Sequence, residues 1–154
     1  MRRAPGLCMF PPPPKARLSK SQDGETHGKK LYCLYAKQRN SYLENKADVS
    51  DQVVVKEAWL PPTLEAVKAA EEDYRTGKGT TESPILAFKT DVLGPKSGLY
   101  IMYNTGLKTP DTDEGWICGT VTSDGNTVTS AGRVQSCMGC HVSAPHGRLF
   151  GTQE

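Results

Sequence analysis

Short apolar runs separated by turn-forming residues dominate the chain from residue 31 onward. The strongest run is Gln52–Trp59, in which three consecutive valines precede a lysine. Leu31–Ala36, Ile85–Asp91, Leu99–Tyr103 and Trp116–Thr122 have the same apolar and aromatic character. Runs of this length and composition, bounded by turn residues, predict β-strands. We therefore expect most of the ordered chain to be sheet.

Turn and helix signals fall between these runs. Ser123–Asn126 contains Asp-Gly, which predicts a hairpin turn, so Thr127–Ser130 should return antiparallel to the preceding strand. Leu64–Tyr74 has apolar residues at helical spacing after a threonine that can cap it. Gln38–Leu43 predicts a short helical turn and Asp111–Gly115 a loop turn. The predicted class is α+β, a predominantly antiparallel β-sheet with a few short helices.

The first 28 residues differ from the rest. Pro11–Pro14 form a stiff extended segment, and Ser19–Gly28 is polar. This composition predicts a proline-rich linker over residues 1–28, followed by one domain over residues 29–154.

A C-x-x-C-H motif stands near the C-terminus as Cys137-Met138-Gly139-Cys140-His141. This spacing is the signature of covalent c-type haem attachment. Cys137 and Cys140, three apart on a helical turn, can each form a thioether with one haem vinyl group. His141 then supplies the imidazole that binds the iron. We expect a C-terminal haem-binding helix that starts near Ala131 or Gly132.

Two other interpretations of the motif stay open. The two cysteines are half of a typical zinc site, but the second pair that such a site needs is missing, and His146 is the one nearby candidate. A thioredoxin-like redox pair would require a βαβ context, which the predicted strands do not provide.

Composition narrows the function classes. The 154 residues carry a net charge of only +2, and the basic residues are scattered. The sequence therefore lacks the clustered basic residues that are typical of a nucleic-acid-binding surface. No apolar run reaches the length of a membrane span. Beyond the motif, the cysteines Cys8, Cys33 and Cys118 permit at most one internal disulfide. Cys33 and Cys118 both lie in predicted strands, so they either face each other as a pair or are buried free thiols.

Covalent haem attachment implies export from the cytoplasm, to the periplasm or beyond. Met1-Arg2-Arg3 resembles the charged start of an export signal, but Ala4–Phe10 is short and contains proline and glycine. We expect the signal either to have been removed from this chain or to lie upstream of Met1.

A six-coordinate electron carrier would need a second strong axial ligand. Met102 lies within a predicted strand, where methionine usually fills core space. His27 and His146 lie in polar segments. We therefore expect five-coordinate iron with an open distal side, which suits binding or chemistry of a small molecule.

The order of these motifs resembles the cytochrome P-460 family, which includes the cytochromes c′-β. The resemblance lies in Val53-Val54-Val55-Lys56-Glu57, in Gly98–Tyr103 and in Gly132–His141, and it covers about residues 27–151. It implies a mainly antiparallel β fold, usually dimeric, that holds a five-coordinate haem c. It also implies a small nitrogen compound or gas as the ligand, and a redox partner protein.

Lys56 matches the lysine that bonds covalently to the haem edge in the hydroxylamine-oxidising members. Lysine is uncommon in such an apolar strand, and a deprotonated lysine is a nucleophile. The alternative is that Lys56 points to solvent, since alternation places it on one strand face with Gln52 and Val54. The c′-β members lack the cross-link and bind nitric oxide.

The side chains around the haem are less well defined by the sequence. A distal proton acceptor is expected in the oxidising members, and the nearest candidates here are Asp91, Glu82 and Lys89, none of which aligns cleanly. Arg133 and Arg148 flank the motif, where they can pair with haem propionates or lie solvated at the surface.

Three functions follow from these observations. The first is oxidation of hydroxylamine to nitrogen oxides, and the second is capture or sensing of nitric oxide. The third is simple electron transfer. A lysine cross-link favours the first and a methionine axial ligand favours the third.

Overall fold

The computed structural model describes most of the chain after residue 30. The described residues are 8–10, 17–19, 28, 30–46, 49–61, 63, 65, 68, 69, 72, 76 and 94–151. The chain divides into two compact units, the first made of residues 1–10, 34–56 and 98–154 and the second of residues 11–33 and 57–97.

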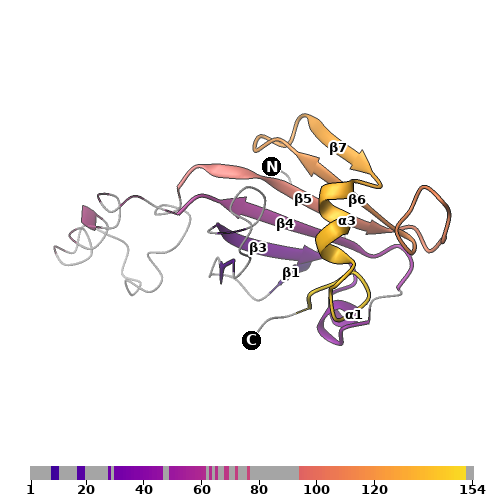
Figure 1. Ribbon diagram of the computed structural model, residues 1–154. Helices are drawn as coiled ribbons and strands as arrows, with labels where there is room; N and C mark the ends of the chain where they lie inside the picture. The colour runs from indigo at the N-terminus through magenta and orange to yellow at the C-terminus, as the bar shows by residue number, and fades with distance from the viewer. Residues whose placement is uncertain are drawn as a thin grey trace. The chain divides into compact units, whose positions relative to one another are not determined.

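Within the described ranges, seven strands form one sheet (Figure 1). They are β1 (Cys8–Phe10), β2 (Arg17–Leu18), β3 (Leu31–Ala36), β4 (Val53–Trp59), β5 (Lys96–Asn104), β6 (Trp116–Val121) and β7 (Val128–Gly132). The order is β1-β3-β4-β5-β6-β7, and β2 also pairs with β3. The pairs β1/β3, β2/β3, β5/β6 and β6/β7 are antiparallel. The predicted α+β class with an antiparallel sheet is confirmed.

Several of the predicted elements are confirmed. The strands predicted at Leu31–Ala36, Gln52–Trp59 and Trp116–Thr122 form β3, β4 and β6, and the strand predicted at Leu99–Tyr103 lies within the longer β5. The short helical turn is α1 (Arg39–Leu43). The predicted strand Ile85–Asp91 and most of the predicted helix Leu64–Tyr74 lie outside the described residues.

The N-terminal segment contributes strands that the sequence pattern did not predict. Cys8–Phe10 pairs with the end of β3, and Arg17–Leu18 pairs with its beginning. Both strands are very short, and neither has enough residues to show the alternation from which strands are predicted.

The hairpin between β6 and β7 forms at the predicted Asp-Gly. The Thr122 amide donates to the Thr127 carbonyl at 2.9 Å, and the Asn126 amide donates to Asp124 Oδ1 at 3.0 Å. Gly125 has φ +79°, a left-handed conformation that glycine adopts without strain.

The start predicted for the C-terminal helix is wrong. Ala131 and Gly132 pair with Gly119 and Cys118 and therefore belong to β7. Gly132 then turns the chain with φ +103°. The helix α3 begins three residues later and spans Gln135–His141.

The hydrophobic core of the first unit lies on one face of its strands, where α3 packs against β5 and β6 (Figure 1). Met102 pairs with Cys118 and Asn104 with Trp116 across β5 and β6. Directly opposite residues share a face, and all four of these are buried. The whole cluster comprises Ala36, Tyr42, Val54, Met102, Trp116, Cys118, Met138 and Leu149.

Two sets of side-chain hydrogen bonds join separate segments of the first unit. The Gln52 side chain is fully buried and exchanges two hydrogen bonds with the Gln38 backbone, at 2.8 and 2.9 Å. The buried Tyr42 hydroxyl on α1 donates to the Gly151 carbonyl at 3.2 Å. The second contact joins the segment after α3 to helix α1.

The second unit contains β2, the first half of β3, the end of β4 and the first residues of β5. The Ser19 amide donates to the Lys30 carbonyl at 2.9 Å, and the Leu60 amide to the Pro95 carbonyl at 3.0 Å. Glu57 and Lys96 form an ion pair.

Candidate functional site

Helix α3 carries the whole C-x-x-C-H motif. Cys137, Cys140 and His141 stand at positions i, i+3 and i+4, which lie on neighbouring parts of one helix face. Cys137 is half-buried and Cys140 is exposed. The Val134 carbonyl accepts the amides of Cys137 at 3.1 Å and Met138 at 3.0 Å, which starts the helix.

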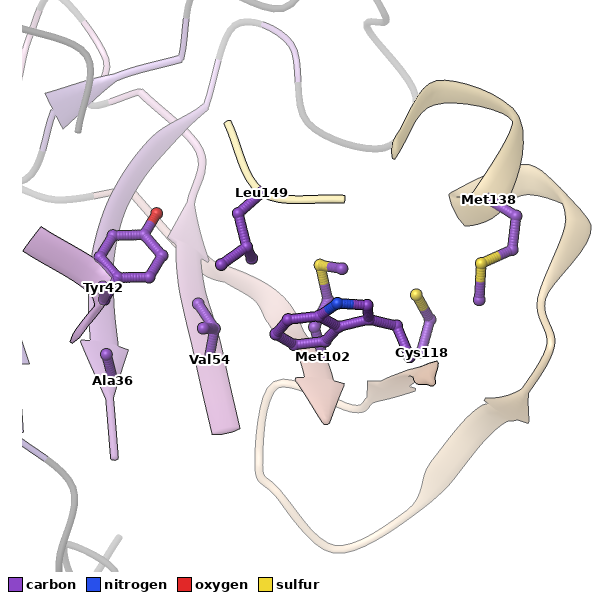
Figure 2. Packing of buried hydrophobic residues seen from close by; sticks show 8 residues of the cluster. Ala36, Tyr42, Val54, Met102, Cys118, Met138 and Leu149 are labelled. Carbon is purple, nitrogen blue, oxygen red and sulfur yellow. The ribbon is translucent and has the colours of Figure 1, made fainter. Parts of the chain in front are cut away.

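Met138, at the centre of the motif, anchors α3 to the sheet. Its side chain is buried and points from the helix toward Cys118 of β6 (Figure 2). Met102 of β5 belongs to the same cluster. The motif is therefore held against the core by the residue between its cysteines, and the side chains that would bind the cofactor are placed beside that anchor.

His141 is fixed by a hydrogen bond to the backbone. Its Nδ1 lies 2.7 Å from the carbonyl oxygen of Arg148. A carbonyl only accepts, so Nδ1 must carry the proton, and Nε2 is then the unprotonated nitrogen of the neutral ring. The ring also packs edge-on against Phe150, with centroids 5.1 Å apart and planes at 67°.

The surroundings of His141 favour its neutral form. Burial lowers the pKa of His141, although the hydrogen bond to the Arg148 carbonyl acts in the opposite direction. The positive charges of Lys56 and Arg148 lower this pKa further. A neutral imidazole with an unprotonated Nε2 is the form that binds a metal ion through that nitrogen.

Arg148 also connects His141 to the turn before β6, because its side chain binds Asp113 in that turn. Its guanidinium binds the Asp113 carboxylate through two bonds, Nε to Oδ2 and Nη2 to Oδ1, the latter at 2.9 Å. The two side chains are 18% and 12% exposed. The hydrogen bonds from Arg148 lower the pKa of Asp113, so the pair is charged at neutral pH.

Lys56 lies on the face of the sheet that carries the core cluster and the motif helix α3. Side chains alternate along a strand, so Lys56 shares a face with Val54 and Gln52. Val54 and Gln52 are both buried, and Val54 belongs to the cluster that contains Met138 of α3. Lys56 itself is half-buried. The face that carries Lys56 is thus the core face, which disfavours the alternative that Lys56 simply points to solvent.

Of the two alternatives predicted for Cys33 and Cys118, the structure agrees with free thiols and not with a facing pair. Cys33 and Cys118 are both free, and β4 and β5 lie between their strands in the sheet order. The thiol of Cys118 is instead influenced by that of Cys137. Burial and this neighbouring thiol raise the pKa of Cys118 to about 12. Burial and the charge of Glu57 raise the pKa of Cys33.

Other predicted residues have the following positions. Met102 is buried in the core cluster, and Arg133 is exposed. His146 pairs with Leu149 through their backbones. The candidate proton acceptors Asp91, Glu82 and Lys89, and also His27, lie outside the described residues.

Two features of the site were not predicted. Asp113 fell within the predicted turn Asp111–Gly115, but nothing in the sequence indicated its partner. The Arg148 carbonyl is a backbone group and therefore has no sequence signal, although Arg148 itself was noted as flanking the motif.

The residues present fit a covalently bound haem. Cys137 and Cys140 are free thiols. The Nδ1–H of His141 donates to a backbone carbonyl, as the second ring nitrogen of a metal-bound histidine usually does. Among the described residues, no group of three or more His, Cys, Asp or Glu side chains is placed to hold a metal ion. A haem site requires only one such protein ligand on its proximal side.

Comparison with known proteins adds no relative. No protein-family model matches the chain, and no curated protein matches its sequence. The resemblance to the cytochrome P-460 family therefore stays a prediction that rests on the residues quoted for it. In the part of the chain that the structure describes, no helix is both long and apolar enough to cross a membrane.

Proposed function

We propose that this chain is a c-type haem protein in which Cys137 and Cys140 bind the haem as thioethers and His141 binds the iron through Nε2. The observation that carries the proposal is the 2.7 Å contact between His141 Nδ1 and the Arg148 carbonyl. That contact favours the tautomer in which Nε2 is unprotonated, the state that a ligating imidazole nitrogen needs, and it occurs in the histidine of a C-x-x-C-H motif.

The proposed activity is oxidation of hydroxylamine to nitrogen oxides. Haem, when bound, supplies the redox-active iron for this reaction. The chain's own residues hold and orient the group. Met138 anchors α3 to the core, and the Arg148 carbonyl holds the His141 ring. The partial burial of His141 lowers its pKa and so favours the neutral imidazole.

Lys56 is the residue that we propose for a bond to the haem edge: its amine nitrogen would replace a hydrogen at a ring carbon, with loss of two protons and transfer of two electrons to an external oxidant. Two observations support it: Lys56 lies on the core face of β4, and its charge affects the pKa of His141. Both are consistent with a side chain directed toward the region where His141 would hold the haem. A cross-link there would alter the conjugation of the ring and hence its reactivity.

Binding of nitric oxide without oxidation is the second candidate. It shares the same proximal histidine and requires no cross-link. Simple electron transfer is less well supported, because Met102, the methionine proposed as its axial ligand, is buried in the core cluster with Met138 and Trp116.

The test compares Lys56→Leu with the wild-type protein after expression with export and haem-maturation machinery. If the cross-link exists, the wild-type ferrous Soret band lies far to the red of ordinary haem c, and a tryptic haem peptide joins both the motif and Lys56. Turnover of hydroxylamine with an artificial electron acceptor should then be lost in Lys56→Leu, while nitric oxide binding is retained. Lys37→Leu, which removes an exposed lysine, is the matched control and should turn over normally.

A plain haem c spectrum with no turnover in the wild-type protein would contradict the oxidase function. Retained binding of nitric oxide in that case would support the second candidate.

A further inference from the structure

Three residues of the first unit form a continuous chain of contacts. The Asp113 carboxylate accepts two hydrogen bonds from the guanidinium of Arg148, and the backbone carbonyl of Arg148 accepts the Nδ1–H of His141 at 2.7 Å. Asp113 lies in the turn before β6, and its amide and carbonyl also bond with the backbone of Trp116 at 2.8 and 2.9 Å. Asp113 is therefore tied by backbone hydrogen bonds to the buried Trp116 at the start of β6.

The backbone at Arg148 needs such support. Its φ of +62° lies in the left-handed region, which residues with a side chain rarely adopt. The turn around it is closed by the His146 amide to the Leu149 carbonyl at 3.1 Å and by the Leu149 amide to the Gly147 carbonyl at 2.8 Å. A conformation of this kind persists when surrounding contacts fix it. The largely buried ion pair with Asp113 is such a contact.

We infer that Asp113 is the positioning residue for His141: by holding the Arg148 guanidinium, it fixes the backbone carbonyl that selects the Nδ1–H tautomer of the imidazole. The inference rests on the proposed function only in taking Nε2 as the iron ligand. A bidentate arginine–carboxylate pair has a defined geometry, so it fixes the orientation of the backbone that carries it. Groups of this kind behind a metal-bound histidine set its ring orientation and its basicity as a ligand.

The decisive experiment measures the ring tautomer of His141 in the full haem-free chain by ¹⁵N–¹H correlation NMR. In the wild type, Nδ1–H should predominate. In Asp113→Asn, the population should shift toward Nε2–H, the tautomer that free histidine prefers in water. Asp111→Asn, two residues earlier and exposed, is the matched control and should keep the wild-type tautomer.

A second variant guards against loss of folding. Asp113→Asn leaves the Arg148 guanidinium without its charged, two-oxygen partner, whereas the double variant Asp113→Asn with Arg148→Met removes both charges and leaves neither one buried alone. The double variant should show the same shift of tautomer. An unchanged Nδ1–H population in either folded variant would overturn the inference.

A second readout uses the haem-loaded protein. Loss of the Nδ1 hydrogen bond makes the imidazole a weaker donor, so Asp113→Asn should lower the iron–histidine stretching frequency in the ferrous state and raise the reduction potential. The haem should still be attached. A chain that takes up no haem would defeat the proposed function, while the NMR result would still decide the role of Asp113. Haem attachment with unchanged frequency, potential and tautomer would overturn the positioning role alone.

Discussion

Met138→Ala tests whether the motif helix depends on core packing. Met138 is 6% exposed and lies in the cluster with Met102 and Cys118. Truncating a buried methionine costs about 2–5 kcal/mol, because apolar contacts are lost and a cavity remains. α3 has only seven residues, so part of the cavity can close by movement of the helix. We therefore expect a loss in the lower half of that range, about 2–3 kcal/mol.

Helix propensity acts in the opposite direction but is too small to change this result. Alanine is a better helix former than methionine by at most a few tenths of a kcal/mol. Urea unfolding of the haem-free chain, followed by fluorescence of the buried Trp116, measures the net effect. With an m-value of about 1.5 kcal/mol per molar urea, a loss of about 2.5 kcal/mol lowers the midpoint by about 1.7 M.

Val142→Ala is the matched control, since Val142 directly follows α3 and is 57% exposed. Its effect should stay within about 0.5 kcal/mol. Equal midpoints for Met138→Ala and Val142→Ala would refute the reasoning that the centre of the motif is a core anchor.

Three further predictions follow from the site. The pKa of Asp113 is lowered by Arg148, so the ion pair stabilises the fold above about pH 4 and this contribution is lost as the pH falls through the lowered value. Urea midpoints of wild type and Asp113→Asn should therefore converge on acidification, and a constant difference would contradict this. The pKa of Cys118 is about 12, so iodoacetamide in mildly alkaline buffer should modify the exposed Cys140 of the folded haem-free chain and spare Cys118 until urea is added. Equal rates, measured on tryptic peptides, would argue against the buried thiol. In the haem-loaded ferric protein, Met102→Ala should leave a high-spin paramagnetic resonance spectrum unchanged, whereas a low-spin signal that disappears would establish a methionine ligand.

The strands that local pattern predicted well are those marked by an adjacent turn or by their own composition. Trp116–Val121 and its return strand are joined by an Asp-Gly turn, so both the turn and the pairing follow from adjacent residues. The strand Val53–Trp59 is marked by consecutive valines. By contrast, Cys8–Phe10 forms a strand only because Leu34–Ala36 provides a partner edge. That pairing joins residues far apart in the sequence, and three residues are too few to show the alternation of apolar and polar positions that predicts a strand.

The motif predicted the candidate haem ligands, but not the contacts that position them. The identities of Cys137, Cys140 and His141 could be taken directly from their spacing. The hydrogen-bond acceptor of His141 is a backbone carbonyl, whose position depends on the left-handed turn at Arg148. Asp113, which binds the Arg148 side chain, stands 35 positions earlier in the chain. Such a contact arises from the fold of the whole unit and has no signal in a single sequence.

The central claim is tested most directly by the intact mass of the protein under denaturing conditions. The chain is produced with export and haem-maturation machinery, beside a variant with Cys137→Ala and Cys140→Ala. Thioether bonds survive denaturation, so the wild-type chain should carry the mass of one haem beyond the polypeptide and the variant should not. A wild-type mass equal to that of the bare polypeptide would contradict covalent haem binding and the function proposed from it.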